Sequence, residues 1–250
     1  MAKKKRATAT PKFDARPDRA DFRDRLYAPG LHLVPREKSL EQWQRYRQPV
    51  LDQGADGACT GFGLAVVANF LMGIRSAAKS VSPRMLYEMA KDYDEWPGDT
   101  YEGSSCKGAV KGWHKHGVCT ASLWPHMEGQ TELNEKRAID AAQRPLGTYY
   151  RLNAYDINNM HAAIAEVGVI YASGDVTQGW FKPKAGVIQD GEKAGGHAFA
   201  IVGYNARGFW IQNSWGSDWG NGGCALLPYS MWLRDGYDAW VMRLGVPTVL

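Results

Sequence analysis

A cysteine at the start of an apolar helix pattern is the first residue in this sequence whose position could do chemistry. Cys59 follows the glycine-rich turn Gly-Ala-Asp-Gly-Ala, where the chain becomes apolar at three- and four-residue spacing. The free amide groups and the dipole of a helix N-terminus favour the thiolate, so we expect a lowered pKa for this thiol. A thiolate nucleophile also requires a base that holds its proton and a group that orients the base.

Candidates for these further roles lie elsewhere in the chain. His197 follows two glycines in GGHAFAIVGY, and Asn213 lies in the glycine- and tryptophan-rich turn of WIQNSWGSDWGNGG. Gln53 lies six residues before Cys59. Each residue alone has a simpler interpretation, as a buried thiol, a hydrogen-bonded histidine or a polar side chain that caps a turn. Together and in this order, the four residues predict a catalytic site.

Three segments give the sequence a family resemblance. Read in order, QGxxGAC, GHAxxxVGY and NSWGxxWGxxG make it similar to the papain family of cysteine peptidases. The resemblance implies that Cys59 is the nucleophile, that His197 is the base and that Asn213 orients the imidazole. It also implies that Gln53 donates into an oxyanion hole, and that Trp215 shields the His–Asn hydrogen bond and floors the leaving-group side.

The resemblance also assigns residues to substrate binding within YEGSSCKG and before the histidine. Gly103 and Ser104 match the strip whose backbone pairs with an extended peptide. The pocket for the side chain two residues before the cut is expected to be shaped by small or apolar residues, namely Ser105, Cys106, Ala172, Gly196 and Leu226 or Leu227. Because these residues are small or uncharged, we expect an apolar side chain there.

Three positions depart from the family pattern. Ser104 stands where the family has a second glycine, and Asp56 stands where secreted members have a disulfide cysteine. Thr60 replaces an aromatic residue directly after the nucleophile, which leaves the packing of that wall unspecified. Roughly thirty residues precede the matching region, so we expect no long inhibitory propeptide of the kind that secreted members carry, and PDRADFRDRLY resembles the entry arm of a prokaryotic-type branch.

Helix and strand patterns are segregated along the chain. The first half is mostly helical and the second half mostly strand, which predicts an α+β fold with two lobes. The family resemblance implies a helical lobe and an antiparallel, barrel-like β lobe with the active site in the cleft between them. We expect a basic tail and extended arm over residues 1–33, the helical lobe over 34–147 and the β lobe over 148–250, with 34–250 as one peptidase domain. Helices are expected over residues 59–73, from 83, over 107–116, over 132–143 and over 158–166.

Charge and cysteine content limit the other functions. The formal net charge is +4, but seven basic and only two acidic residues fall among the first 20, so the rest of the chain is close to neutral. We therefore expect no nucleic-acid groove in the folded body and read KKKR as a solvated tail. Four cysteines without a CxxC pair, and no secretory signal, favour free thiols in the cytoplasm. We expect a monomer with no cofactor, no metal and no membrane segment.

The expected activity is hydrolysis of peptide bonds in peptides or proteins by a Cys–His–Asn site. Two alternatives stay open at this stage. A transpeptidase or amide-forming acyltransferase would use the same thioester and pass it to an amine. A non-catalytic peptide-binding homologue would keep the fold but needs no aligned thiol, imidazole and amide.

Overall fold

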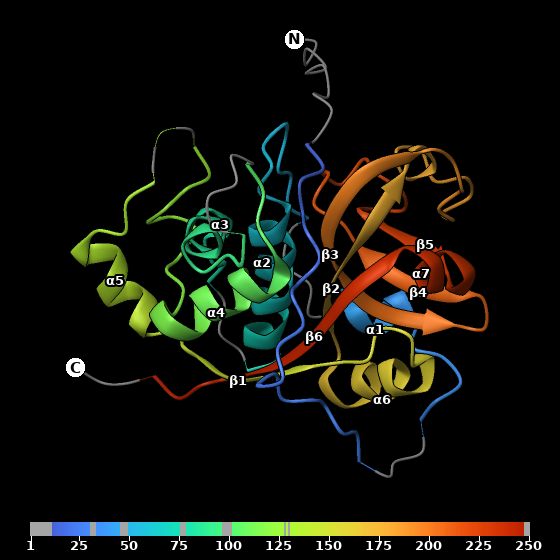
Figure 1. Cartoon of the computed structure of the whole chain (residues 1–250), viewed down its shortest axis with the longest axis horizontal. Coiled ribbons are helices and arrows are strands. Elements are labelled where there is room, and N and C mark those ends of the chain that lie inside the picture. Colours follow the sequence, from blue (N-terminus) through green and yellow to red (C-terminus); the bar gives the residue numbers. More distant parts are fainter. Residues whose placement is uncertain are drawn as a thin grey trace.

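The computed structural model describes residues 12–30, 34–45, 50–75, 79–96, 102–127, 129 and 131–247. The basic part of the tail, including KKKR, lies outside these residues. A helical lobe lies beside a strand-rich lobe, which confirms the α+β fold with two lobes (Figure 1). The helices are α1 (Leu40–Gln44), α2 (Cys59–Gly73), α3 (Pro83–Asp92), α4 (Cys106–His116), α5 (Glu135–Ala142), α6 (Ile157–Val167) and α7 (Tyr229–Asp235). The strands are β1 (Leu146–Arg151), β2 (Ile170–Thr177), β3 (Lys193–Asn205), β4 (Gly208–Gln212), β5 (Cys224–Pro228) and β6 (Gly236–Leu244).

Helix ends in the helical lobe follow local sequence signals. The Ser82 side chain accepts a hydrogen bond from the Met85 amide, and Pro83 occupies the first position of α3. Gly117 follows α4 with a φ of 70°, a conformation that favours glycine. These caps fix where the two helices start and stop beside the central helix α2.

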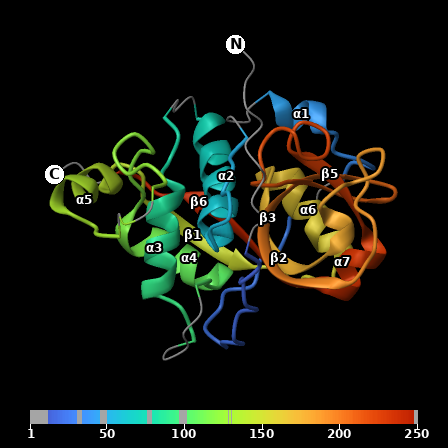
Figure 2. The same cartoon turned by 90° about the horizontal axis from the view of Figure 1, so that it is seen from above.

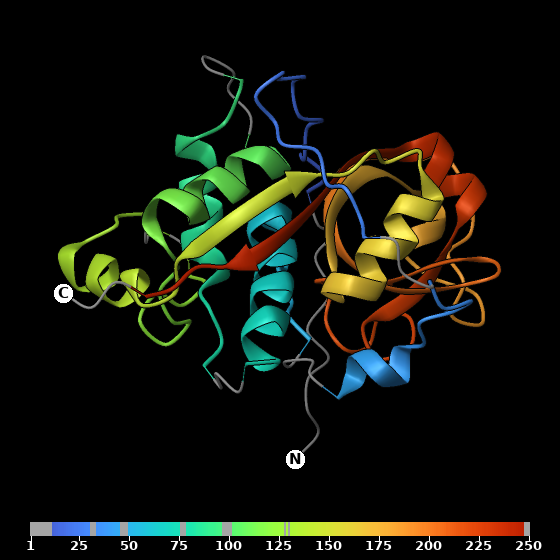
Figure 3. The same cartoon turned by 90° about the horizontal axis from the view of Figure 1, so that it is seen from below.

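All six strands belong to one antiparallel sheet in the order β1-β6-β2-β3-β4-β5. Seen from below, β1 and β6 leave the strand lobe and run beneath the helical lobe (Figure 3). The pair therefore links the two lobes. The boundary between residues 147 and 148 remains a prediction, and β1 spans it.

Strand β3 has apolar side chains on both faces. Ala198, Ala200 and Val202 belong to the core cluster that includes α2. Phe199 and Ile201, which alternate with them, belong to the core of the strand lobe. β3 is thus the wall shared by both cores, and it carries the predicted base.

The described part of the N-terminal arm, residues 12–30, is extended rather than helical. It passes between the two lobes, as the blue trace in Figures 1 and 2 shows. Single-residue bridges join it to β3, to the start of α4 and to the end of β1. None of the helices in the described residues has the length and apolar content needed to cross a membrane.

Candidate active site

Cys59 is the first residue of α2 and faces the strand lobe. Its thiol lies at the backbone N–H of Ala198, directly after the predicted base in β3. The close approach of α2 to β3 requires a small residue at position 63, because a Cβ on Gly63 would lie 3.1 Å from the Ala198 backbone. The nucleophile candidate from one lobe is therefore held against the base-bearing strand of the other.

His197 and Asn213 are brought together by neighbouring strands. His197 lies in β3, and Asn213 directly follows β4, which pairs with β3 in antiparallel register. His197 Nε2 lies 2.8 Å from Asn213 Oδ1. Because a carbonyl oxygen only accepts, Nε2 carries the proton in this bond. Nδ1 is buried with no hydrogen-bond partner among the described residues, so its lone pair is free to act as a base.

Both reactive groups are fully buried in this structure. Burial raises the pKa of the Cys59 thiol to about 11, although backbone N–H groups at Ala198 and Thr60 act in the opposite direction. Burial also lowers the pKa of His197 to about 4, against the opposing effect of its bond to Asn213. The lowered thiol pKa expected from the helix N-terminus is therefore absent in this closed arrangement, because the cost of burying charge exceeds the contribution of the amides.

Gln53 is held on the same side of the site by Ser214. Its Oε1 accepts from the Ser214 hydroxyl at 2.7 Å, and its backbone N–H donates to the Ser214 carbonyl at 2.9 Å. Its Nε2 donates to the Asp56 carbonyl at 3.0 Å. The sequence analysis missed this contact, although Ser214 lies inside the NSW segment that drew attention to its neighbours.

Trp215 covers the His–Asn pair. Its ring centroid lies 5.0 Å from that of His197, and it stacks on Phe181 at 5.9 Å. Its Nε1 is buried with no hydrogen-bond partner among the described residues. The indole therefore places an apolar surface beside His197, and its role in shielding the Nε2–Oδ1 bond remains a prediction.

Comparison with known proteins identifies the family. The model of the papain family cysteine protease matches residues 35–230, which is more than half of the chain. This chain belongs to the papain family of cysteine peptidases. It is accordingly a hydrolase, and the papain-like form of its two-lobe fold is confirmed.

Relatives within the papain family are distant in sequence. Cathepsin B-like CP2 of Giardia intestinalis is 28% identical over 236 residues, which cover 87% of this chain and 70% of the relative. Cysteine endopeptidase Rep1 of Oryza sativa subsp. japonica is also 28% identical, and the match covers 90% of this chain but only 62% of that protein. Among solved structures, xylellain, a cysteine protease from Xylella fastidiosa, superposes with a TM-score of 0.77 at 24% identity, covering 97% and 99% of the two chains.

Two departures from the papain-family pattern meet in one hydrogen bond. The hydroxyls of Thr60 and Ser104 lie 2.6 Å apart, and both side chains are buried. The residue after Cys59 is thereby tied to the segment that is predicted to pair with substrate. The third departure, Asp56, forms an ion pair of 3.1 Å with Arg84 of α3, so an ionic contact is present where secreted family members place a cysteine.

The residues assigned to substrate backbone are occupied by the chain's own arm. The Ala15 N–H donates to the Gly196 carbonyl at 3.1 Å, and the Arg16 N–H donates to the Ser104 carbonyl at 3.3 Å. Arg16 also forms a bridge with Ser105. A Cβ on Gly103 would overlap the Asp14 carbonyl oxygen. The sequence analysis did not foresee this contact, since nothing in the arm has a strand pattern.

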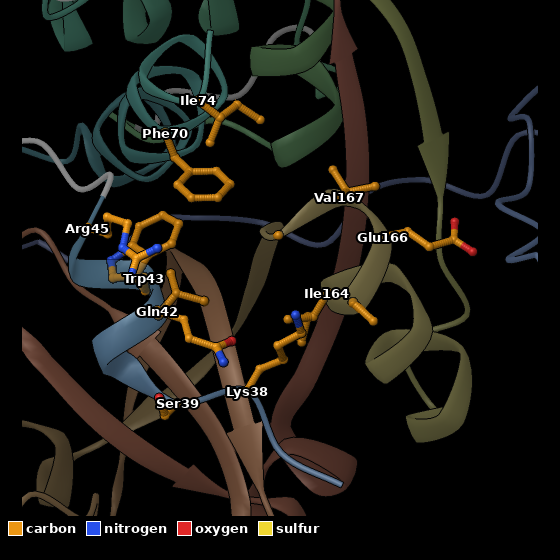
Figure 4. A pocket seen from close by; sticks show the side chains of 13 residues that line it. Lys38, Ser39, Gln42, Trp43, Arg45, Phe70, Ile74, Ile164, Glu166 and Val167 are labelled. Atoms are coloured by element: carbon orange, nitrogen blue, oxygen red, sulfur yellow. The ribbon is translucent and has the colours of Figure 1, made fainter. Parts of the chain in front are cut away.

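A separate cavity of about 510 Å³ lies between α1 and the C-terminal end of α6 (Figure 4). None of the predicted site residues lines it. In its wall Trp43 stacks on Phe70, with ring centroids 4.3 Å apart, and Trp43 Nε1 donates to Gln212 at 2.6 Å. The cavity is thus connected to the site indirectly, through Gln212, which directly precedes Asn213. Within the described ranges, no cluster of three or more His, Cys, Asp or Glu side chains could hold a metal ion.

Proposed function

We propose that this papain-family peptidase cleaves peptide bonds through a thioester formed on Cys59. His197 Nδ1 takes the thiol proton as the sulfur attacks the peptide carbonyl, and then gives it to the leaving amine. Asn213 keeps the imidazole in the tautomer that leaves Nδ1 unprotonated. Water then hydrolyses the thioester, with His197 as the base. The observation that supports this most strongly is the 2.8 Å Nε2–Oδ1 bond beside an Nδ1 that has no partner among the described residues.

The developing oxyanion would be stabilised at the start of α2. The Cys59 backbone N–H is one of the free amides of the first helical turn. Gln53 Nε2 has two hydrogens, and the Asp56 carbonyl takes one of them. The second hydrogen is the donor that we assign to the oxyanion. An extended peptide would pair with residues 103–105 and with Gly196.

Attack requires a Cys59 thiolate paired with a His197 imidazolium, and this ion pair requires a change in the surroundings of both groups. Removal from water makes the neutral thiol and neutral imidazole the favoured forms in the closed site. When water or substrate enters, the cost of charge on both groups falls. The helix-start amides and the imidazolium then favour the thiolate.

The test compares single cysteine substitutions in the full chain. Cys59→Ala should abolish cleavage of a mixed peptide library, whereas Cys119→Ala, which removes a buried thiol outside the site, should retain it. Cleavage is measured by mass spectrometry with and without added glycinamide. Free-acid products in the presence of the amine support hydrolysis, and amide products would support transfer instead. Undiminished cleavage by Cys59→Ala would refute the proposal.

A further inference from the structure

Helix α3 contacts both of the segments that border the nucleophile. The first segment, residues 53–57, carries the proposed oxyanion donor, and the second, residues 102–105, is predicted to pair with substrate. The two segments meet at Gly57, where a Cβ would lie 3.2 Å from the carbonyl oxygen of Glu102. Helix α3 also packs closely on α2, since a Cβ on Gly61 would lie only 2.4 Å from a carbonyl oxygen of α3. Side chains of one helix can therefore reach both segments.

Arg84 of α3 holds the first segment through Asp56. Its Nη1 donates to Asp56 Oδ2 at 3.1 Å. The backbone carbonyl of Asp56 in turn accepts from Gln53 Nε2 at 3.0 Å, and this bond uses one of the two amide hydrogens. The direction of the other hydrogen, which the proposed function assigns to the oxyanion, therefore depends on where Asp56 lies. Arg84 is buried, so its contact with Asp56 is largely shielded from water.

Tyr87, one helical turn later, holds the second segment. Its hydroxyl donates to the Glu102 carbonyl, and the same oxygen lies beside Gly57. Burial, with the charges of Asp56 and Glu88, raises the pKa of Tyr87, so the hydroxyl keeps its proton and remains a donor. This bond therefore fixes the first residue of the segment that is predicted to pair with substrate.

The two holding residues are themselves fixed on one face of α3. Arg84 Nη2 lies 2.5 Å from Glu88 Oε1, and Lys91 Nζ lies 2.7 Å from Glu88 Oε2. The Lys91 ammonium and the Arg84 guanidinium lie 4.6 Å and 5.6 Å from the ring centroid of Tyr87. Spacings of three and four residues place these side chains next to one another on the helix. We call Arg84, Tyr87 and Glu88 the α3 brace.

We propose that the α3 brace is a positioning element for catalysis, in which Arg84 sets the oxyanion donor and Tyr87 sets the segment that binds substrate. This inference rests on the proposed function. The oxyanion exists only in the transition state, so a displaced Gln53 should lower kcat and leave KM nearly unchanged. Substrate pairs with residues 102–105 before reaction as well as during it, so loosening that segment should raise KM and leave kcat nearly unchanged.

Steady-state kinetics on a peptide substrate test the assignment of Arg84. Arg84→Met, and the milder Asp56→Ala, which leaves the Asp56 carbonyl in place, should each lower kcat by about 10- to 100-fold with KM within about twofold of the parent. Arg144→Met is the matched control, because it breaks a similarly buried ion pair of 2.9 Å with Asp140 outside the site. It should keep the parent kcat. Parent-like kcat in both Arg84→Met and Asp56→Ala would overturn the proposal.

A second substitution shows whether Arg84 acts through Gln53. In a Gln53→Ala chain, Arg84→Met should lower kcat further by less than about twofold, because the donor that it positions is already gone. A merely structural role for Arg84 would lower kcat by the same factor with and without Gln53. That result would overturn the assignment of Arg84 as a positioning residue.

Tyr87→Phe tests the hold on the second segment. It should raise KM about fivefold with a parent-like kcat, since one neutral hydrogen bond is lost. Tyr204→Phe is the matched control, because it removes a hydroxyl that donates to the Pro35 carbonyl at 2.7 Å, and it should leave both constants unchanged. An unchanged KM in Tyr87→Phe would remove Tyr87 from the brace.

Cys59→Ala, assayed beside these variants, separates the two proposals. If Cys59→Ala cleaves at the parent rate, the proposed function is refuted and the brace with it. If Cys59→Ala is inactive while the brace variants keep the parent kcat and KM, the brace alone is refuted. Loss of kcat in Arg84→Met only when Gln53 is present would support both.

Discussion

Two buried polar centres lie side by side in this molecule, and they differ in how fully their hydrogen bonds are made. In the active site, His197 Nδ1, Asn213 Nδ2 and Trp215 Nε1 are buried without a partner among the described residues. We call the second centre the anchor, and it consists of Asp18, Lys107, Asp238, Arg151 and Trp240. In it Asp18 accepts from two donors, and Asp238 accepts from Asp18, Arg151 and Ser173. The active-site centre therefore keeps hydrogen-bonding capacity that a substrate or water could use, whereas the carboxylates of the second centre are bonded within the chain.

The largest expected effect comes from removing the base. His197→Ala should lower kcat/KM by about 10⁴-fold or more, because the thiol loses both its proton acceptor and the acid for the leaving group. The free energy of unfolding should change little, since Asn213 Oδ1 keeps its 2.8 Å bond from the Ser214 amide. Peptide-cleavage kinetics and urea unfolding on the same preparation check both parts. A variant that loses stability rather than activity would assign His197 to structure.

The next effect concerns the oxyanion donor. Gln53→Glu keeps an acceptor for the Ser214 hydroxyl but replaces the amide donor with a negative charge. We expect kcat/KM to fall by about 100- to 1000-fold, as for loss of one oxyanion-hole donor. Gln42→Glu on the exposed face of α1 makes the same charge change far from the site and is the control. Equal activity in the two variants would remove Gln53 from the catalytic group.

A substitution in the anchor should have the opposite effect and change the stability of the fold rather than catalysis. Arg151→Met leaves the buried carboxylate of Asp238 without its ionic partner, so the free energy of unfolding should fall by about 2–4 kcal/mol. Arg234→Met breaks an exposed ion pair with Asp190 and should change stability little. Urea denaturation measures both. If the two variants are equally stable, the anchor has no special role in holding the fold.

The pH dependence of stability tests the anchor without removing a partner. Burial, and then the neighbouring charge of Asp238, raise the pKa of Asp18 to about 8, although the Lys107 amide, Trp240 and Arg151 oppose this shift. Folding therefore takes up a proton, and the stabilisation present at low pH is lost as the pH rises through about 8.

The pKa of Asp238 is also raised, chiefly by burial, so the pair titrates together and the free energy of unfolding should fall as the pH rises through this range. Buried histidines with lowered pKa values, such as His197, act below this window. Asp18→Asn should flatten the slope over the same interval in urea unfolding. An unchanged slope would show that Asp18 does not titrate with folding.

The smallest expected effect concerns the bond between the two family departures. Thr60→Val and Ser104→Ala each remove one hydroxyl of the 2.6 Å pair. A double-mutant cycle should give a coupling free energy of about 0.5–1.5 kcal/mol, since one neutral hydrogen bond is shared. Additive losses would mean that the two substitutions are independent of each other.

The sequence predicted the elements that have local signals. The turn before Cys59, the Ser82 cap with Pro83, and Gly117 each fix a helix end through contacts within a few residues, and all three helix ends are confirmed. Elements without such signals were missed, among them β1, which is short and defined by its pairing with β6.

The site was predictable to a similar extent. Cys59, His197 and Asn213 lie in segments whose order and spacing resemble a family, and the structure brings them to one place. The position of Ala15 in the site was not predictable, because single backbone bonds between distant residues leave no periodic pattern in the sequence. The sequence does not distinguish Phe13, which packs against Trp215, from Phe22 in the same charged arm, which is exposed.

The most direct test of the account is to trap the thioester. The full chain is mixed with a peptide p-nitrophenyl ester, quenched with acid within milliseconds and digested for mass spectrometry. We predict the acyl mass on the peptide that contains Cys59 and on none of the peptides that contain the other three cysteines. Turnover of the ester with no acyl group on Cys59, or with the acyl group on another residue, would contradict the account.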